Sequence, residues 1–180
     1  MTFVAHSIVG ATVAAAVAPR RFKTWQKATL VGAFVVLGNL PDLDFSFWGH
    51  SRYDISHSIF VNLGLVLVAA GPFLASSKLR GKIGGAGVVC GVAAAWLSHL
   101  LLDTFYAHGP GIAIYWPFSK ARLALPIPFF QTLKRADIYF DSHSVRVFAI
   151  EVAFYGSFSV LFLLMVHAAR LRHERSGRQK

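Results

Sequence analysis

The sequence predicts an all-helical integral membrane protein in which about five helices pack as a bundle. Hydrophobic residues make up 55% of the 180 residues and charged residues only 14%, whereas a soluble domain has about 25% charged residues. Several apolar segments approach the ~20 residues that a helix needs to cross a bilayer. The chain has 18 Lys and Arg against 8 Asp and Glu, and the basic residues lie mainly between apolar segments. This distribution is typical of membrane topology rather than of nucleic-acid binding.

Five apolar segments are expected to be helical, and they form one domain over residues 1–180. The first, about residues 3–18, is short and rich in alanine, and the second, about residues 28–40, stops where proline follows. The third, fourth and fifth, about residues 55–75, 83–105 and 145–169, are long enough to span a bilayer. The two short segments are expected to tilt, to thin the bilayer or to be buried against the other helices. A long outer connection, residues 106–142, joins the fourth segment to the fifth, and a basic tail starts at about residue 170.

The basic residues predict the orientation of the chain. They are concentrated after the first segment, after the third segment and in the C-terminal tail, so the positive-inside rule places the C-terminus in the cytoplasm and the N-terminus outside, with five crossings. A cleaved signal peptide ending near Ala18 is the competing interpretation, and the missing basic n-region argues against it. The long outer connection is also basic, but long loops count less in this rule; its basic residues are Lys120, Arg122, Lys134 and Arg135.

Residues of the types that bind metal ions gather at the predicted outer ends of these segments. An ionisable side chain at the edge of a bilayer is costly without a partner, so a group of them predicts a functional site. The charge count that predicts the orientation did not use these residues. Their location on one side is therefore an independent check of that orientation. They are His6, Asp42, Asp44, His57, His99 and Asp103, with Arg52 before the third segment and His143 and Glu151 at the start of the fifth.

Two motifs supply carboxylates. His99 and Asp103 are four residues apart, so both side chains leave one face of a helix and can bind one ion, although a helix-end histidine bonded to a carboxylate is the alternative. Asp42 and Asp44 follow the second segment, and alternate residues of an extended stretch point to opposite sides. One of them would then bind a metal directly, and the other would bind a second ion or contact a group that itself binds the metal. The alternative is a solvated turn.

Ser56, His57 and Ser58 precede the apolar part of the third segment. A serine nucleophile would need contact with the histidine, and neighbouring residues on a helix do not face each other. We therefore interpret His57 as a metal ligand and the serines as helix caps. His143 is a further candidate ligand.

Histidine and carboxylate ligands without thiolate suit zinc, with manganese or iron as alternatives. Six ligands are too many for one catalytic zinc, so two ions sharing a carboxylate are expected. Such a pair of ions activates a water molecule and stabilises the attacking and the leaving oxygen of a displacement at phosphorus. The residues predicted to act in catalysis are Asp44 and Arg52. Arg52 could neutralise a phosphate, because the planar guanidinium of arginine binds two phosphate oxygens at once.

These motifs resemble the YdjM family, also called DUF457, whose members are described as membrane-bound metal-dependent hydrolases. The resemblance covers roughly residues 1 to 130 and departs from the family's Arg-Gly-x-Thr-His-Ser pattern at Arg52, which lies one residue further from His57. The family is similar at a distance to the all-helical zinc-dependent phospholipase C and P1 nuclease, which implies phosphoester hydrolysis. The matching stretches are residues 5–7, 40–44, 56–58, 96–104 and 114–128.

The leading hypothesis is a phosphoesterase at the outer face of a bacterial inner membrane, acting on a lipid or another phosphate ester. Its expected partners are membrane lipids and that substrate, with Arg122 or Lys120 as further phosphate-binding groups. A metal transporter or sensor would need polar residues toward the bilayer centre, where Asn62 is the main one. The third possibility is a non-catalytic interaction protein with a structural metal site. Nucleic acid is not expected, since anionic lipid explains the basic tail.

Overall fold

All regular secondary structure in the part of the chain that the structure describes is helical. The computed structural model describes residues 1–106, 110–133 and 141–177, so the predicted outer-side basic residues Lys134 and Arg135 lie outside the described residues. The prediction of an all-helical fold is confirmed. The elements are α1 (Phe3–Val17), α2 (Thr24–Asn39), the 3-10 helices η1 (Leu40–Asp42) and η2 (Gly49–Arg52), α3 (Tyr53–Ser56), α4 (Ile59–Ala75), α5 (Ser77–Lys82), α6 (Ala86–Asp103) and α7 (Ser142–Gly177).

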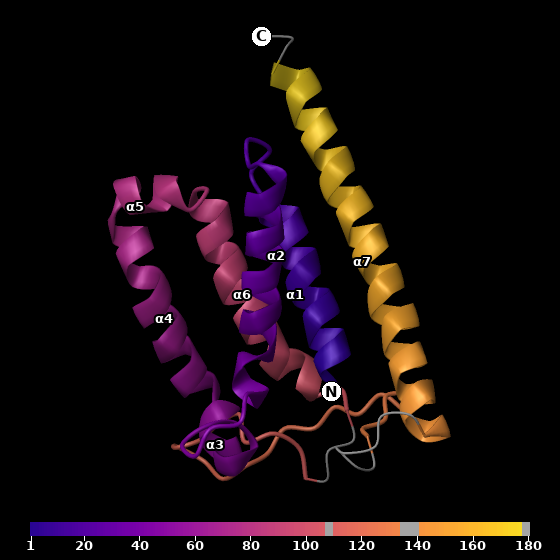
Figure 1. Ribbon diagram of the computed structural model, residues 1–180. Helices are drawn as coiled ribbons and strands as arrows, with labels where there is room; N and C mark the ends of the chain where they lie inside the picture. Colours follow the sequence, from indigo (N-terminus) through magenta and orange to yellow (C-terminus); the bar gives the residue numbers. More distant parts are fainter. Residues whose placement is uncertain (107–109, 134–140, 178–180) are drawn as a thin grey trace.

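The five long helices run between two ends of the molecule (Figure 1). Helix α1 packs against α2, α6 and α7, while α4 contacts α6 and leans away from the others. The N-terminus, η1, η2 and α3 lie at one end, and α5, the α1–α2 turn and the C-terminus lie at the other. The segments with predicted metal ligands therefore share one end, and the basic segments share the opposite end.

The helix boundaries differ from the predicted ones in three places. Helix α2 starts at Thr24 because the Gln26 side chain accepts the backbone N–H of Lys23 and caps the first turn. The third segment is broken between α3 and α4, at His57 and Ser58. Helix α7 runs to Gly177, since its arginine-rich and glutamate-containing end has good helix propensity.

Helices α1 and α2 cross at two glycines. A Cβ atom at Gly10 would lie 2.5 Å from the carbonyl oxygen of Phe34, and a Cβ at Gly38 would lie 3.0 Å from the carbonyl oxygen of His6. Only glycine allows the two backbones to approach this closely. The crossing sets His6 beside the C-terminal end of α2.

We expect Gly10→Ala to destabilise the protein, because the new methyl group overlaps the α2 backbone, and overpacking costs about 1–3 kcal/mol. Gly32→Ala is the matched control, since a Cβ there has no atom within 4 Å and alanine favours a helix. Thermal unfolding in detergent should give a lower midpoint for Gly10→Ala and an equal or higher one for Gly32→Ala. An unchanged midpoint for Gly10→Ala would show that the two helices separate without cost.

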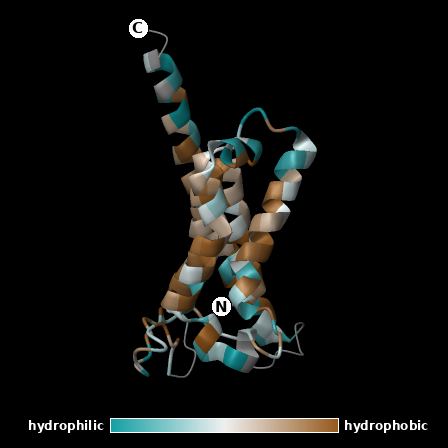
Figure 2. Cartoon of the chain, turned by 90° about the vertical axis from the view of Figure 1, so that its left-hand side faces the viewer, coloured by the Kyte–Doolittle hydropathy of each residue, from teal (hydrophilic) through white to brown (hydrophobic). Residues whose placement is uncertain are grey.

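Two helices are long and apolar enough to cross a membrane by length and composition: α6, and α7 over Ser142–Ser176. Helices α1 and α4 are shorter apolar helices of 15 and 17 residues. Figure 2 shows hydrophobic residues along the helices and hydrophilic ones mainly toward the two ends. Large apolar side chains such as Val68 of α4 and Leu161 of α7 face outward. The surface therefore carries apolar area where a soluble protein usually carries charge.

Candidate metal centre

Five of the predicted ligands converge at one end of the bundle. His6 lies in the second turn of α1, Asp42 ends η1, His57 lies between α3 and α4, and His99 and Asp103 lie in the last turns of α6. The three histidines and Asp103 are buried, and the Asp42 side chain is 21% exposed. We call these five residues the His/Asp cluster. Ligand atoms of His6, Asp42, His99 and Asp103 all lie within 4.8 Å of one another.

Four atoms of the cluster have the spacing of a tetrahedral metal site. The Nε2 atoms of His57 and His99 lie 3.4 Å apart. They lie 3.2 and 3.5 Å from Asp42 Oδ1, and 3.3 and 3.4 Å from Asp103 Oδ2. Tetrahedral ligands about 2.0–2.1 Å from a zinc ion lie about 3.3 Å from one another. Five of the six distances among these four atoms match that spacing, and we call the four atoms the inner set.

The other oxygen of each carboxylate faces His6. His6 Nε2 lies 3.3 Å from Asp103 Oδ1 and 3.9 Å from Asp42 Oδ2. The α-amino group of Met1 lies 2.9 Å from the same Asp103 oxygen. We call His6 Nε2, Asp42 Oδ2 and Asp103 Oδ1 the outer set. Both carboxylates therefore contribute one oxygen to each set, as bridging carboxylates do.

The hydrogen bonds of the two inner histidines use Nδ1 and orient Nε2 toward the carboxylates of the cluster. His99 Nδ1 lies 2.8 Å from the carbonyl oxygen of Gly38, which only accepts, so Nδ1 donates. His57 Nδ1 lies 2.8 Å from Ser56 Oγ, whose own proton goes to the Gly49 carbonyl. Each ring therefore carries a proton on Nδ1 and directs Nε2 toward the carboxylates. A metal ion that binds at Nε2 would displace the proton there and leave the tautomer typical of metal-binding histidines.

The break in the third predicted helix positions His57. The Asn62 amide donates to the carbonyl oxygens of Ser56 and Ser58, both at 2.7 Å, and accepts from the Trp96 indole N–H at 2.8 Å. The first bond satisfies the Ser56 carbonyl, which the interrupted helix leaves without a backbone donor, and the second adds to the backbone N–H of Asn62 that the Ser58 carbonyl already accepts. Ser58 caps α4, as predicted. Asn62 was noticed in the sequence only as an isolated polar residue, and its link to Trp96 had no sequence signal.

The expectation that Ser56 and His57 do not face each other is wrong. The helix ends at Ser56, so the two side chains make the contact described above. Ser56 is fully buried and donates to the Gly49 carbonyl. Its geometry suits the orientation of His57 and does not suit attack on a substrate.

Asp44 and His143 lie outside the cluster, which corrects the predicted set of ligands. Asp44 is exposed, and its Oδ1 would be 2.7 Å from a Cβ at Gly49. Its carboxylate therefore lies against the Gly49 turn, on a different side from that of Asp42. His143 makes a hydrogen bond of 2.9 Å through Nε2 to the Thr132 carbonyl of the long connection, and it does not belong to the group of residues whose ligand atoms lie together.

Glu151 and Arg52 also have positions other than those predicted. Glu151 is buried and accepts from the backbone N–H and the hydroxyl of Thr2, so it fixes the start of α1. Arg52 is exposed and lines a pocket beside the cluster, in which no cluster residue takes part. Its predicted role next to the metals is therefore not supported by its position.

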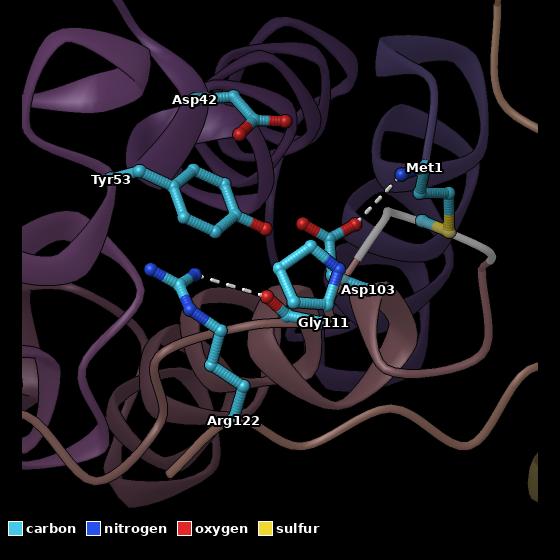
Figure 3. A pocket seen from close by; sticks show the side chains of 7 residues that line it. Met1, Asp42, Tyr53, Asp103, Gly111 and Arg122 are labelled. Atoms are coloured by element: carbon cyan, nitrogen blue, oxygen red, sulfur yellow. Dashed lines mark hydrogen bonds and ion pairs between the residues drawn. The ribbon is translucent and has the colours of Figure 1, made fainter. Parts of the chain in front are cut away.

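One side of the cluster opens into a pocket of about 290 Å³ (Figure 3). The guanidinium of Arg122 is held by Asp54 at 2.8 Å and by the Gly111 carbonyl at 3.2 Å. Figure 3 shows the Tyr53 hydroxyl pointing toward the carboxylate of Asp103. The sequence singled out Arg122 only as an alternative cation and gave no signal for Tyr53. The pocket is lined by Met1, Asp42, Tyr53, Asp103, Pro110, Gly111 and Arg122.

Electrostatic interactions favour the metal-binding forms of the carboxylates. Burial raises the pKa of Asp42, but hydrogen bonds from His57 and His99 outweigh it, and its pKa lies well below the usual range. Burial lowers the pKa of His57, but bonds to Asp103 and Asp42 raise it above 6.5 overall. Burial, with the Asp103 and Asp42 charges, raises the pKa of Tyr53, which stays a hydrogen-bond donor at neutral pH. A metal binding here displaces a proton.

Comparison with known proteins identifies one family. A family model described as YdjM inner membrane protein matches residues 1–173. No curated protein and no solved structure matches the chain. The resemblance predicted from the sequence motifs is confirmed, and the match extends through the long connection and most of α7.

Proposed function

The chain belongs to the YdjM inner membrane protein family, and on this premise we propose that it is a membrane-bound metal-dependent hydrolase that cleaves phosphate esters. The observation that carries the proposal is the His/Asp cluster, whose two ligand sets share Asp42 and Asp103 and open on one side. A structural zinc site is closed by four protein ligands, whereas a catalytic one keeps a position for water or substrate. Here Asp42 and Asp103 line a pocket that also contains Arg122.

The inner set would hold one divalent transition metal, and the outer set, with fewer protein ligands, a second. Zinc suits this donor set best, and manganese and iron also fit. Bound there, the ions would acidify a water and neutralise charge at phosphorus. Arg122 would bind a phosphate oxygen, because Asp54 and Gly111 hold its guanidinium at the wall of the pocket. Tyr53 would donate a hydrogen bond to the same group.

Exposed aromatic side chains at this end support a lipid substrate. Phe47 is 71% and Phe118 79% exposed, and Phe45 and Tyr115 are exposed as well. Aromatic side chains gather at the membrane–water interface. We infer that the chain crosses the membrane several times, with the pocket at headgroup level on the outer side. The basic ends and the C-terminus would then lie in the cytoplasm.

A structural metal site is the second candidate, and the full burial of His57 and His99 favours it. A transporter is less well supported, because Asn62, the main polar residue beyond the cluster, is already bonded to Trp96 and to the backbone. The structural site predicts metal without turnover, so activity separates it from the hydrolase.

We expect metal-replete wild-type protein in detergent to release phosphate or a phosphorylated product from at least one phosphate ester. The screen should contain aryl phosphates, phosphatidic acid, lysophospholipids and lipid diphosphates, each tested with and without a chelator. Activity that the chelator removes and that added metal restores would support the hydrolase. A metal-loaded protein that turns over none of these substrates would leave the structural site as the better explanation.

A further inference from the structure

A second pocket, of about 410 Å³, adjoins the pocket that Asp42 and Asp103 line, which we call the metal pocket. Tyr53 and Arg122 line both, so the two spaces share a wall. Figure 3 shows these two side chains in the metal pocket. The cluster residues do not line this second pocket. It is lined by Arg52, Tyr53, Asp54, Ile55, Trp116 and Arg122.

The second pocket has more positive than negative charge. Its one carboxylate, Asp54, is already paired with Arg122 at 2.8 Å. Arg52 has no ion-pair partner among the described residues, so its charge is not compensated there. An arginine next to aromatic walls binds anions in a bidentate manner. The charge and the lining therefore suit a phosphate group and do not suit an apolar chain.

The walls of the second pocket are fixed by contacts to α4 and within the connection. Ile59 N donates to the Ile114 carbonyl at 3.0 Å, and Ser58 Oγ donates to the Trp116 carbonyl. Ile112 and Leu123 exchange two backbone hydrogen bonds, which place Arg122 opposite α3. A site built from such contacts needs little rearrangement on binding.

We propose that the second pocket binds a second phosphate group, so that the substrate is a diphosphate ester. This rests on the proposed function and specifies its substrate class. The terminal phosphate would lie at the metal pocket and the inner phosphate between Arg52 and Arg122. The oxygen of water bonds to the terminal phosphorus, and the bond from that phosphorus to the bridging oxygen breaks. The electron pair stays on the bridging oxygen, and the products are a phosphate monoester, inorganic phosphate and one proton.

Arg122 has a separate role in each of the two pockets that it lines. It contacts the reacting phosphate in one pocket and stabilises the leaving phosphate in the other. Arg52 is a binding residue for the leaving phosphate only. This division accounts for the position of Arg52 away from the cluster and for its lack of an ion-pair partner within the described part of the chain.

The test is calorimetric binding of methylenediphosphonate and of inorganic phosphate to the metal-loaded full-length protein in detergent. Wild type should bind the diphosphonate about tenfold or more tightly than phosphate. Arg52→Gln should lose that difference and keep its affinity for phosphate. The matched control is Arg172→Gln, an exposed arginine in the C-terminal part of α7, and that part of the helix lies at the opposite end of the molecule. Metal content is measured after each titration, because diphosphonates also chelate metals.

Equal diphosphonate affinity in wild type and Arg52→Gln, at equal metal content, would overturn the second phosphate site. The result is independent of turnover. If the wild type cleaves monoesters but Arg52→Gln binds the diphosphonate normally, only the substrate class is wrong. If no ester is cleaved but the Arg52 dependence is present, the site is supported and the hydrolase proposal fails alone.

Discussion

His99→Ala is expected to remove both metal ions and to lower phosphate-ester hydrolysis to the background rate. Its Nε2 is one of four atoms of the inner set, 3.4–3.5 Å from the bridging carboxylates. In the proposed two-metal site, loss of the inner ion would remove the charge that orients both oxygens of Asp42 and Asp103. The outer ion would then lose the fixed position of two of its three protein ligands. Mutation even of outer-shell partners costs about 10–100-fold in metal affinity, so a direct ligand costs more.

His6→Ala should differ from His99→Ala in the number of metals retained. His6 belongs only to the outer set, so this variant should keep about one equivalent of metal where the wild type binds about two. The matched control is His143→Ala, since that histidine binds the Thr132 carbonyl and should keep the full content. Metal content is measured by mass spectrometry, with circular dichroism to check the helices. Equal metal loss in the His6 and His99 variants would contradict two overlapping sites, and metal-free wild type after metal-replete purification would contradict any metal site.

The convergence of the cluster could be predicted from the sequence because it follows from short-range rules. His99 and Asp103 lie on one helix face because they are four residues apart. The ends of the apolar segments lie at the same depth because each segment crosses the same bundle. The charge distribution then places those ends together. The same rules place His6 and Asp42 at that end of the bundle. In the structure His6 Nε2 lies 3.3 Å from Asp103, and Asp42 lies 3.2 Å from His57 Nε2.

The positions of Asp44 and Arg52 could not be predicted, because they depend on one turn. Gly49 has a φ of +66°, and a Cβ there would lie 2.4 Å from the Leu43 carbonyl oxygen, so glycine is required. This turn folds the segment back, which sets Asp44 beside Gly49 and Arg52 beside the second pocket. Spacing along the chain contains no information about such a reversal.

The position of Arg122 also could not be predicted from the sequence, because it depends on long-range contacts. It enters the pocket from the long connection, which the sequence presents only as rich in proline and aromatic residues. Its position depends on the backbone pairing of Ile112 with Leu123 and on the ion pair with Asp54, 68 residues away. The cation at the metal pocket is therefore a result of tertiary structure, and Arg52, which is close to His57 in sequence, is not that cation.

Arg122→Ala is expected to lower kcat/KM by about 100-fold or more with metal content unchanged. Arg122 lines the pocket but belongs to neither ligand set, so its loss removes phosphate binding and leaves the ions in place. Removing one preorganised donor to a developing charge typically costs 10²–10³ in rate. Arg122→Lys should recover only part of the activity, because an ammonium group keeps the charge but lacks the planar fork that binds phosphate oxygens in a bidentate manner. The readouts are initial rates on the best ester from the screen and metal content of the same sample.

The Arg122 variants also separate binding of the reacting phosphate from general loss of structure. Asp54→Asn removes the ion pair that holds Arg122 but keeps the guanidinium, so its effect on kcat/KM should be smaller than that of Arg122→Ala. Arg172→Gln should leave the rate unchanged. If Arg122→Ala has wild-type activity, the charge at phosphorus is stabilised by the metals alone. If Asp54→Asn and Arg122→Ala lose activity and metal together, the ion pair supports the fold, and Arg122 does not act on the substrate.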